Sequence, residues 1–287
     1  MRVLVIGKTG QVATELAALA PDAVCLGRDG AEMSDPEGAG VAVGRALREA
    51  GAAAAINAAA YTAVDRAEED EALADAVNGV APGAIARACA GAGIPLVHIS
   101  TDYVFDGSGR APRPPDAPTA PLGVYGRTKL AGEEAVRAAG GVHAILRTSW
   151  VFSPHGANFV KTMLRLSETR DTLSIVADQI GGPTSARAIA AACLRIAARL
   201  QEAPALSGTY HFAGAPDVSW ADFARAIFDA AGRRVAVRDI PSSDYPTPAA
   251  RPLNSRLDCR TTESAFAIAR PDWRIDLRDT LNAMGAA

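Results

Sequence analysis

The first nineteen residues constrain the fold of this chain most. Arg2 to Ile6 form a short apolar run, small residues fill the segment Gly7 to Ala13, and helical spacing then begins at Leu16. This order predicts a strand, a tight glycine turn and a helix whose free amides suit a pyrophosphate. Gly7 permits the turn, and Gly10 lets the backbone approach a phosphate closely. The segment indicates dinucleotide binding, and the alternative is an ordinary strand-to-helix turn.

The composition favours an enzyme of the cytoplasm. The chain has 287 residues and a formal net charge of −3, so no basic excess points to nucleic acid. The alanine-rich segments are interrupted by charges, and no apolar stretch reaches membrane-spanning length. The four cysteines and four histidines are scattered, a distribution typical of reduced thiols rather than of disulfides or a metal cluster. We therefore expect no metal site, no nucleic-acid partner and no membrane partner.

Strand-like and helix-like segments alternate through the first half of the chain. The apolar runs at 23–26, 52–56, 94–99 and 142–146 predict strands, and 36–50 and 80–92 predict helices, with Asp35 as an N-cap. This pattern predicts an α/β fold of the Rossmann type, a doubly wound parallel sheet with a smaller C-terminal α/β substrate domain. We expect residues 1–150 to bind NAD(P) and residues 151–287 to bind mainly substrate, with 170–177 and 185–212 returning to the first domain.

The end of the second predicted strand indicates which cofactor is preferred. In dinucleotide-binding folds, a residue about 20 positions after the phosphate turn contacts the adenosine ribose, and an acidic residue there favours a free 2′-hydroxyl. Gly27 and Arg28 stand at this point, which indicates room and a cation for a 2′-phosphate. We therefore predict a preference for NADPH over NADH. The alternatives are that Asp29 or Glu32 contacts a ribose, or that Arg28 is a solvated loop residue.

A second group of polar residues is suited to carbonyl reduction. Thr101 follows the strand predicted at 94–99, and Tyr125 and Lys129 are four residues apart, which places them on one face of a helix. A tyrosine titrates near pH ~10, and a neighbouring ammonium would lower that value. We therefore predict Tyr125 as proton donor, Lys129 as its partner, and Thr101 as a hydrogen-bond donor to the substrate oxygen. Tyr125 and Lys129 are also predicted to contact the cofactor.

These motifs resemble a known family. Their order is similar to that of the extended short-chain dehydrogenase/reductases, whose Ser/Thr-Tyr-Lys triad matches Thr101, Tyr125 and Lys129. The segments that carry a closer resemblance, to the dTDP-4-dehydrorhamnose reductases, are GKTGQV (7–12), NAAAYTAVDRAE (57–68), STDYVFDG (100–107), YGRTKLAGE (125–133), RTSWVF (147–152), NFVKTML (158–164), DQIGGPT (178–184) and YPTPAARPLNSRLD (245–258). They span nearly the whole chain.

The resemblance implies a reaction and a set of residues. The reaction is reduction of the 4-keto group of dTDP-4-dehydro-β-L-rhamnose by NADPH or NADH, giving dTDP-β-L-rhamnose. By matching position, the implied cofactor contacts are Gly7, Gly10, Gln11, Val12, Ala60, Tyr61 and Thr62. The implied substrate contacts are Thr101, Asp102 and Trp150. Some family members dimerise around Mg²⁺, but Arg187 stands where such a site would want an acid beside Glu15. A structural Mg²⁺ is therefore possible but not supported.

The proline-rich stretch from 239 to 258 has few periodic apolar positions. A stretch of this length is usually disordered or forms a functional wall, and the second interpretation is favoured because Arg251 and Asn254 suit a diphosphate and a nucleobase. The alternative for Arg251 is a surface salt bridge. Two other functions stay open: another sugar-nucleotide epimerase or reductase of the same superfamily, and a non-catalytic NADP-binding regulatory subunit. The protein is expected to be a monomer or a homodimer.

Overall fold

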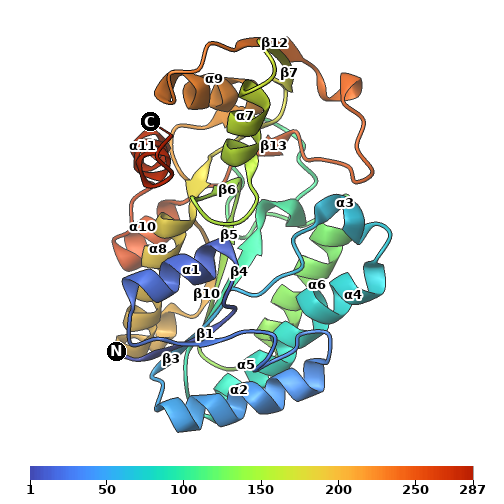
Figure 1. The fold of residues 1–287 in the computed structure, drawn as a ribbon. Helices are drawn as coiled ribbons and strands as arrows, with labels where there is room; N and C mark the ends of the chain where they lie inside the picture. The colour runs from blue at the N-terminus through green and yellow to red at the C-terminus, as the bar shows by residue number, and fades with distance from the viewer. Residues whose placement is uncertain (287) are drawn as a thin grey trace.

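A parallel six-stranded sheet forms the centre of the protein. The structure, a computed structural model, describes residues 1–286. Across the sheet the strands run in the order β10-β5-β4-β3-β1-β2 (Figure 1). Their bounds are β1 Val3–Ile6, β2 Val24–Leu26, β3 Ala54–Asn57, β4 Leu96–Thr101, β5 His143–Thr148 and β10 Gly208–His211. The chain goes outward from β1 to β2 and then crosses to β3 on the other side, so the switch point of this sheet lies between β1 and β3.

Helices cover both faces of this sheet. Val3 and Val5 of β1 pack toward one face, with α1 (Gln11–Leu19) and α8 (Ala186–Glu202). Leu4 and Ile6 pack toward the other face, with α2 (Pro36–Ala50), α5 (Ala81–Gly91) and α6 (Val124–Ala138). Alternate residues of one strand point to opposite faces of the sheet. The sheet is therefore the middle layer of a three-layer α/β structure, with helices above and below it. The predicted Rossmann-type fold class is confirmed.

Two helix starts follow the sequence closely. The side chain of Asp35 accepts a hydrogen bond from the Gly38 amide at 3.1 Å, and α2 ends at Gly51 in the left-handed conformation. The hydroxyl of Ser219 accepts from the Asp222 amide at 3.0 Å where α9 (Trp220–Ala230) begins. Both caps satisfy amides that a helix start leaves free.

Short helical turns connect the larger elements on the α6 side of the sheet. Between β3 and α5 the chain forms α3 (Val64–Ala67), α4 (Glu71–Asp75) and the π-helical turn η1 (Ala76–Val80). After β4 it forms the 3₁₀ turn η2 (Asp102–Val104). The amide of Val124 donates to the Glu68 carboxylate at 2.8 Å, so a residue that follows α3 caps the start of α6.

The second half of the chain builds a separate aromatic core above the carboxyl ends of the strands (Figure 1). Phe152, Phe223 and Trp273 are buried there. The surrounding helices are α7 (Phe159–Ser167), α9 and α11 (Trp273–Ala283), whereas α10 (Arg260–Phe266) packs against α8 and β10 of the large sheet. The strands are β6 (Val151–Phe152), β7 (Thr172–Val176), β8 (Ile180–Gly181), β9 (Thr184–Ser185), β11 (Val218–Ser219), β12 (Ala236–Ile240) and β13 (Asn254–Ser255), and the remaining 3₁₀ turns are η3 (Pro204–Leu206) and η4 (Ser242–Asp244).

The structure departs from the sequence prediction at several elements of this half. The segment 170–177 does not return to the large sheet, because β7 pairs in parallel with β12. In contrast, β10 pairs with β5 at the edge of the large sheet, and α8 packs on it. The strand β12 and the helices α10 and α11 were not predicted. Among residues 1–286, none of the helices combines the length and apolar character that crossing a bilayer demands.

Candidate active site

The turn after β1 has the geometry that a phosphate requires. Gly7 has φ of 118°, a value that favours glycine, and a Cβ there would meet the Ala58 carbonyl carbon at 3.3 Å. Gly10 is the N-cap of α1, and no side chain in residues 1–286 caps the first amides of this helix. A Cβ at Gly10 would find no heavy atom of the described chain within 4 Å. The first turn of α1 is therefore open to a bound anion.

Two adjoining cavities meet at this turn. One is about 880 Å³ and is lined by Gly7, Arg28 and Tyr61 among others. The other is about 530 Å³ and is lined by residues from both halves of the chain, including the predicted residues Gln11, Val12, Thr62, Thr101, Asp102, Tyr125, Lys129 and Trp150. Thr9, Gly10 and the segment 58–60 line both cavities, so together they form one continuous depression. Its position above the switch point between β1 and β3 is where doubly wound sheets bind ligands.

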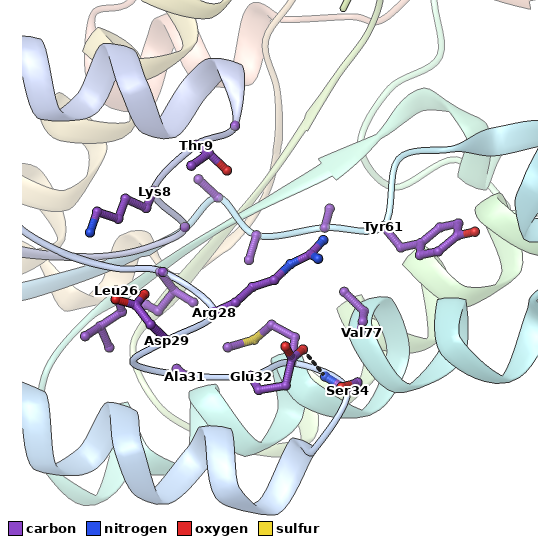
Figure 2. A pocket seen from close by; sticks show the side chains of 18 of the residues that line it. Lys8, Thr9, Leu26, Arg28, Asp29, Ala31, Glu32, Ser34, Tyr61 and Val77 are labelled. Carbon is purple, nitrogen blue, oxygen red and sulfur yellow. Dashed lines mark hydrogen bonds between the residues drawn. The ribbon is translucent and has the colours of Figure 1, made fainter. Parts of the chain in front are cut away.

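Arg28 lies inside the first cavity. Its side chain extends across the space toward the segment that carries Tyr61, while Asp29 lies near Leu26 (Figure 2). The carboxylate of Glu32 accepts the Ser34 amide at 3.0 Å, and that hydrogen bond lowers the pKa of Glu32. Arg28 is therefore a charged side chain that extends across the opening of this cavity, and Lys8 is a second cation of its lining. The Tyr61 hydroxyl points away, toward Asp70, at 3.4 Å.

Thr101, Tyr125 and Lys129 line the second cavity together. Thr101 ends β4, and its hydroxyl accepts the Tyr103 amide at 3.2 Å and contacts Asp102 Oδ1 at 3.2 Å. The start of α6 packs tightly on η2, because a Cβ at Gly126 would lie 2.2 Å from the Tyr103 carbonyl oxygen. This close approach sets Tyr125 beside Thr101, whose hydroxyl lowers the pKa of the phenol.

The proton affinities at these residues differ from the sequence expectation. Burial raises the pKa of Tyr125 to about 12, and the Thr101 hydrogen bond offsets only part of the rise. The expected lowering by Lys129 is therefore wrong for the protein without its cofactor. Lys129 Nζ donates to the Ile99 carbonyl at 2.7 Å, and burial lowers the pKa of Lys129 to about 8. The phenol holds its proton firmly, and the lysine releases its own more easily than an exposed lysine does.

Two buried polar atoms at the second cavity lack hydrogen-bond partners in the described chain, Asp102 Oδ2 and Thr148 Oγ1. Burial raises the pKa of Asp102 to about 6, against the hydrogen bonds from Ser255 and Thr101. Buried polar groups are nearly always paired, so these two atoms indicate polar partners from a ligand. Thr148 did not stand out in the sequence.

The remaining predicted substrate residues have different surroundings. Trp150 has φ of 50° and stacks on Trp220 with ring centroids 3.6 Å apart, and it lines the second cavity. Arg251 Nη2 lies 2.7 Å from Asp65 Oδ2, while its Nη1 is buried without a partner in residues 1–286. Asn254 donates to the Ser108 and Ala111 carbonyls and lines neither cavity. The structure thus does not bring Asn254 to the site, because its amide pins the loop at 108–111.

A buried ion pair that the sequence analysis did not predict joins α6, which carries Tyr125 and Lys129, to β5. Glu133 of α6 is fully buried, and its carboxylate accepts from Arg147 at 2.8 and 2.7 Å and from Ser100 at 2.6 Å. Arg137 adds a further bond at 2.7 Å. The signal was present in the sequence, because a charged residue in the apolar run of a central parallel strand, as Arg147 is, requires a buried partner.

A second carboxylate, Glu15 of α1, is also buried and paired. His155 Nε2 lies 3.3 Å from Glu15 Oε1, and Arg187 Nη1 lies 3.4 Å from Glu15 Oε2. Across residues 1–286, no group of three or more His, Cys, Asp or Glu side chains has a metal-binding arrangement. The surroundings of Glu15 are those of an ion pair within one chain.

Comparisons with known proteins agree with this geometry. The family model described as the RmlD substrate binding domain matches residues 1–286. The dTDP-4-dehydrorhamnose reductase of Sinorhizobium fredii is 45% identical over 97% of this chain and 96% of its own length. Among solved structures, the reductase of that name from Clostridium acetobutylicum has a TM-score of 0.90 and 32% identity, covering 99% of this chain and 100% of its own.

A further solved structure, dTDP-4-dehydrorhamnose reductase from Bacillus anthracis in complex with NADP, has a TM-score of 0.89 and 32% identity. It covers 98% of this chain and 99% of its own length. The resemblance drawn from the motifs is confirmed along the whole described chain. This protein belongs to the RmlD substrate binding domain family, among the dTDP-4-dehydrorhamnose reductases.

Proposed function

We propose that this protein reduces the 4-keto group of dTDP-4-dehydro-β-L-rhamnose to dTDP-β-L-rhamnose, with NADPH or NADH as reductant. The observation that carries the proposal is the meeting of Thr101, Tyr125 and Lys129 on the wall of one cavity, next to the open phosphate turn. The full-length similarity to dTDP-4-dehydrorhamnose reductases supports the substrate, and the relative that holds NADP supports the cofactor.

The residues of the chain fit the cofactor. The first turn of α1 and the segment 58–60 would hold the pyrophosphate, Tyr61 and Thr62 would contact the dinucleotide, and Lys129 would contact a ribose. When bound, the reduced dinucleotide supplies the hydride. The Arg28 side chain in the first cavity supports binding of a 2′-phosphate, because a guanidinium binds such a group with charge-assisted hydrogen bonds. We therefore assign to this chain a preference for NADPH.

The side chains of the site move one proton. Tyr125 gives its phenolic proton to the ketone oxygen, and the Thr101 hydroxyl holds that oxygen by a hydrogen bond. The raised pKa of Tyr125, about 12, keeps the phenol protonated in the resting protein at neutral pH. Lys129, whose pKa burial lowers to about 8, returns a proton to the phenolate. Reduction thus consumes one proton for each hydride.

The substrate side of the site is built from both halves of the chain. We assign the sugar hydroxyls to Asp102 and Thr148, whose buried oxygens lack partners in residues 1–286. We assign Trp150 to the surroundings of the sugar. The Nη1 of Arg251, which is buried without a partner in residues 1–286, is assigned to the diphosphate, although Arg251 lines neither cavity. In this assignment residues 1–150 hold the cofactor and also supply Thr101, Asp102, Thr148 and Trp150 to the substrate, and the chain from 151 onward adds Arg251.

The test is oxidation of NADPH, followed by absorbance with the 4-keto sugar nucleotide generated in situ. Tyr125→Phe is expected to lower kcat by roughly 10²- to 10⁴-fold and to leave the Kd for NADPH unchanged. The matched control is Tyr210→Phe, because the Tyr210 hydroxyl donates to the Leu206 carbonyl far from the site, and its kcat should match that of the unchanged protein. If the unchanged protein binds NADPH without turnover, the regulatory-subunit alternative is favoured instead.

A further inference from the structure

A row of three buried polar side chains runs beneath the proposed active site. Asn57 ends β3, His98 lies in the middle of β4, and Lys129 lies on α6. All three are buried, His98 completely. Asn57 Nδ2 lies 3.1 Å from His98 Nδ1, and Lys129 Nζ lies 3.5 Å from His98 Nε2. The proposed mechanism uses only the last of these residues.

The orientation of Asn57 determines which ring nitrogen of His98 carries the proton. Asn57 Oδ1 accepts the Ala59 amide at 3.1 Å, so the amide nitrogen of Asn57 must face the ring. That nitrogen only donates, and therefore His98 Nδ1 accepts and has no proton. Burial lowers the pKa of His98 well below its usual value, with a contribution from the charge of Lys129, so the ring is neutral. A neutral ring without a proton at Nδ1 has its N–H at Nε2.

The Nε2 proton of His98 then points at the amino group of Lys129. An ammonium has three donors and no acceptor, so a facing N–H opposes it, whereas a neutral amine has a lone pair that accepts. The Ile99 carbonyl, 2.7 Å from Nζ, takes one donor in either state. We propose that His98 is a positioning residue that acts through Lys129: Asn57 fixes its Nε2–H tautomer, and this N–H destabilises the ammonium form of the lysine.

Other charged groups near Lys129 act with or against His98. On α6 itself, Glu133 lies one turn further on and favours the ammonium, and Tyr125 lies one turn before as a neutral phenol. On the η2 side, Asp102 is a buried carboxyl group, and on β5 the charge of Arg147 is balanced by Glu133. His143 begins β5 and acts on His98. Burial is the largest influence on the pKa of Lys129, and Glu133 opposes it. The N–H of His98 is the further contribution that we infer from the 3.5 Å approach of its Nε2 to Nζ.

The effect of His98 on turnover rests on the proposed function, but its effect on the protonation of Lys129 does not. If Lys129 must be protonated to restore Tyr125, kcat/KM should fall as the pH rises through the pKa of Lys129, about 8. The state of Lys129 itself can be measured in the protein without cofactor or substrate. A failure of the inference and a failure of the proposed function are therefore distinguishable.

The sequence makes this measurement simple, because it contains three lysines, Lys8, Lys129 and Lys161. In protein labelled with ¹³C at the lysine ε-carbon, Lys8→Arg and Lys161→Arg assign the third NMR signal to Lys129. Its titration midpoint is expected near pH 8. The ¹⁵N shifts of His98 should show a neutral ring protonated at Nε2. A proton on Nδ1, or a Lys129 midpoint at the usual value for lysine, would overturn the inference.

Two variants test the direction of the effect. Asn57→Asp replaces the facing donor by an acceptor, so His98 should move its proton to Nδ1, and the Lys129 midpoint should rise by at least about one pH unit. His98→Phe removes the N–H without adding a charge and should raise the midpoint by a smaller amount. The control His143→Phe removes a histidine from the neighbouring strand and should leave the midpoint in place.

The alkaline limb of kcat/KM in each variant should move with the NMR midpoint. A structural role alone would lower activity at every pH without moving that limb. If His98→Phe fails to fold, Asn57→Asp and the tautomer in the unchanged protein still decide the question. Midpoints that stay unchanged in folded Asn57→Asp would refute the role of the tautomer.

Discussion

Replacing Glu133 should be among the most destabilising single changes in this protein. Glu133→Gln removes the negative charge that Arg147 faces, and Arg147 is only 2% exposed. In the variant, the Arg147 guanidinium still contacts the Pro115 carbonyl at 3.0 Å and the ring of His211. That ring is neutral, because burial and the charge of Arg147 lower the pKa of His211 to about 3. The variant therefore leaves a buried cation without its counter-charge.

The magnitude follows from the burial of both partners. Removing one member of a buried ion pair costs about 3–5 kcal/mol, because the other charge stays desolvated. Domains unfold with about 5–15 kcal/mol, so the loss is a large part of the total. With a urea m-value of roughly 2–3 kcal/mol/M, the unfolding midpoint should fall by about 1–2.5 M. The double variant Glu133→Leu with Arg147→Met removes both charges and should be less destabilised than Glu133→Gln.

The assay is urea unfolding followed by far-UV circular dichroism at pH 7.5. The control is Glu71→Gln, whose partner Arg127 lies 3.1 Å away on the surface, with both side chains about half exposed or more. Such a pair contributes less than about 1 kcal/mol. Burial raises the pKa of Glu133, but Arg147, Ser100 and Arg137 outweigh it and hold the pKa below its usual value. The stabilisation is thus present at neutral pH and is lost in acid as the pH falls through that lowered pKa. Equal midpoint shifts in Glu133→Gln and the control would refute the reasoning.

Three further predictions concern the cofactor, a turn and a buried acid. Arg28→Ala should lower kcat/KM for NADPH about 10- to 100-fold and leave that for NADH nearly unchanged, which steady-state kinetics with both cofactors will measure. Gly107→Ala should lower the unfolding midpoint more than Gly109→Ala, because both have positive φ but only Gly107 would place a Cβ 2.5 Å from Pro252 Cα. Asp102→Asn should raise the melting temperature at pH 7.5 and not at pH 3.5: burial raises the pKa of Asp102 from 3.8 to about 6, so its ionisation costs stability progressively between these two values and in full above the higher one.

The first half of the fold could be predicted because its signals are local. The glycine turn at Gly7, the N-cap at Asp35 and the apolar runs of the strands each follow from neighbouring residues, and the parallel order then follows from their alternation with helices. The second half has short strands whose pairing is decided by distant segments. The pairing of β7 with β12 joins residues more than 60 positions apart, and nothing within 172–176 specifies that partner.

Most residues of the candidate site could be predicted from the sequence, but the directions of their pKa shifts could not. Spacing placed Tyr125 and Lys129 on one face of α6, but the direction of the pKa shift at Tyr125 depends on burial and on where Lys129 Nζ points. Asn254 was assigned from residue type alone, and its amide is used by the backbone of another loop. His98 was passed over as an isolated histidine, although a polar residue inside an apolar parallel strand indicates a buried partner.

The side chain of Gln11 joins two parts of the chain that lie more than 140 residues apart. Its Oε1 accepts from Ser153 Oγ at 2.9 Å and from Asn158 Nδ2 at 3.0 Å, while its backbone opens α1 beneath the cofactor cavity. Both donors also bond within their own loop, because Ser153 Oγ donates to the His155 carbonyl at 3.0 Å and Asn158 Nδ2 donates to the Ser153 carbonyl at 2.8 Å. Gln11 thus ties this loop to the start of α1. In an alignment of homologous reductases, positions 11, 153 and 158 should therefore co-vary, and a graft of either loop alone into a relative should fail unless its counterpart is transferred with it.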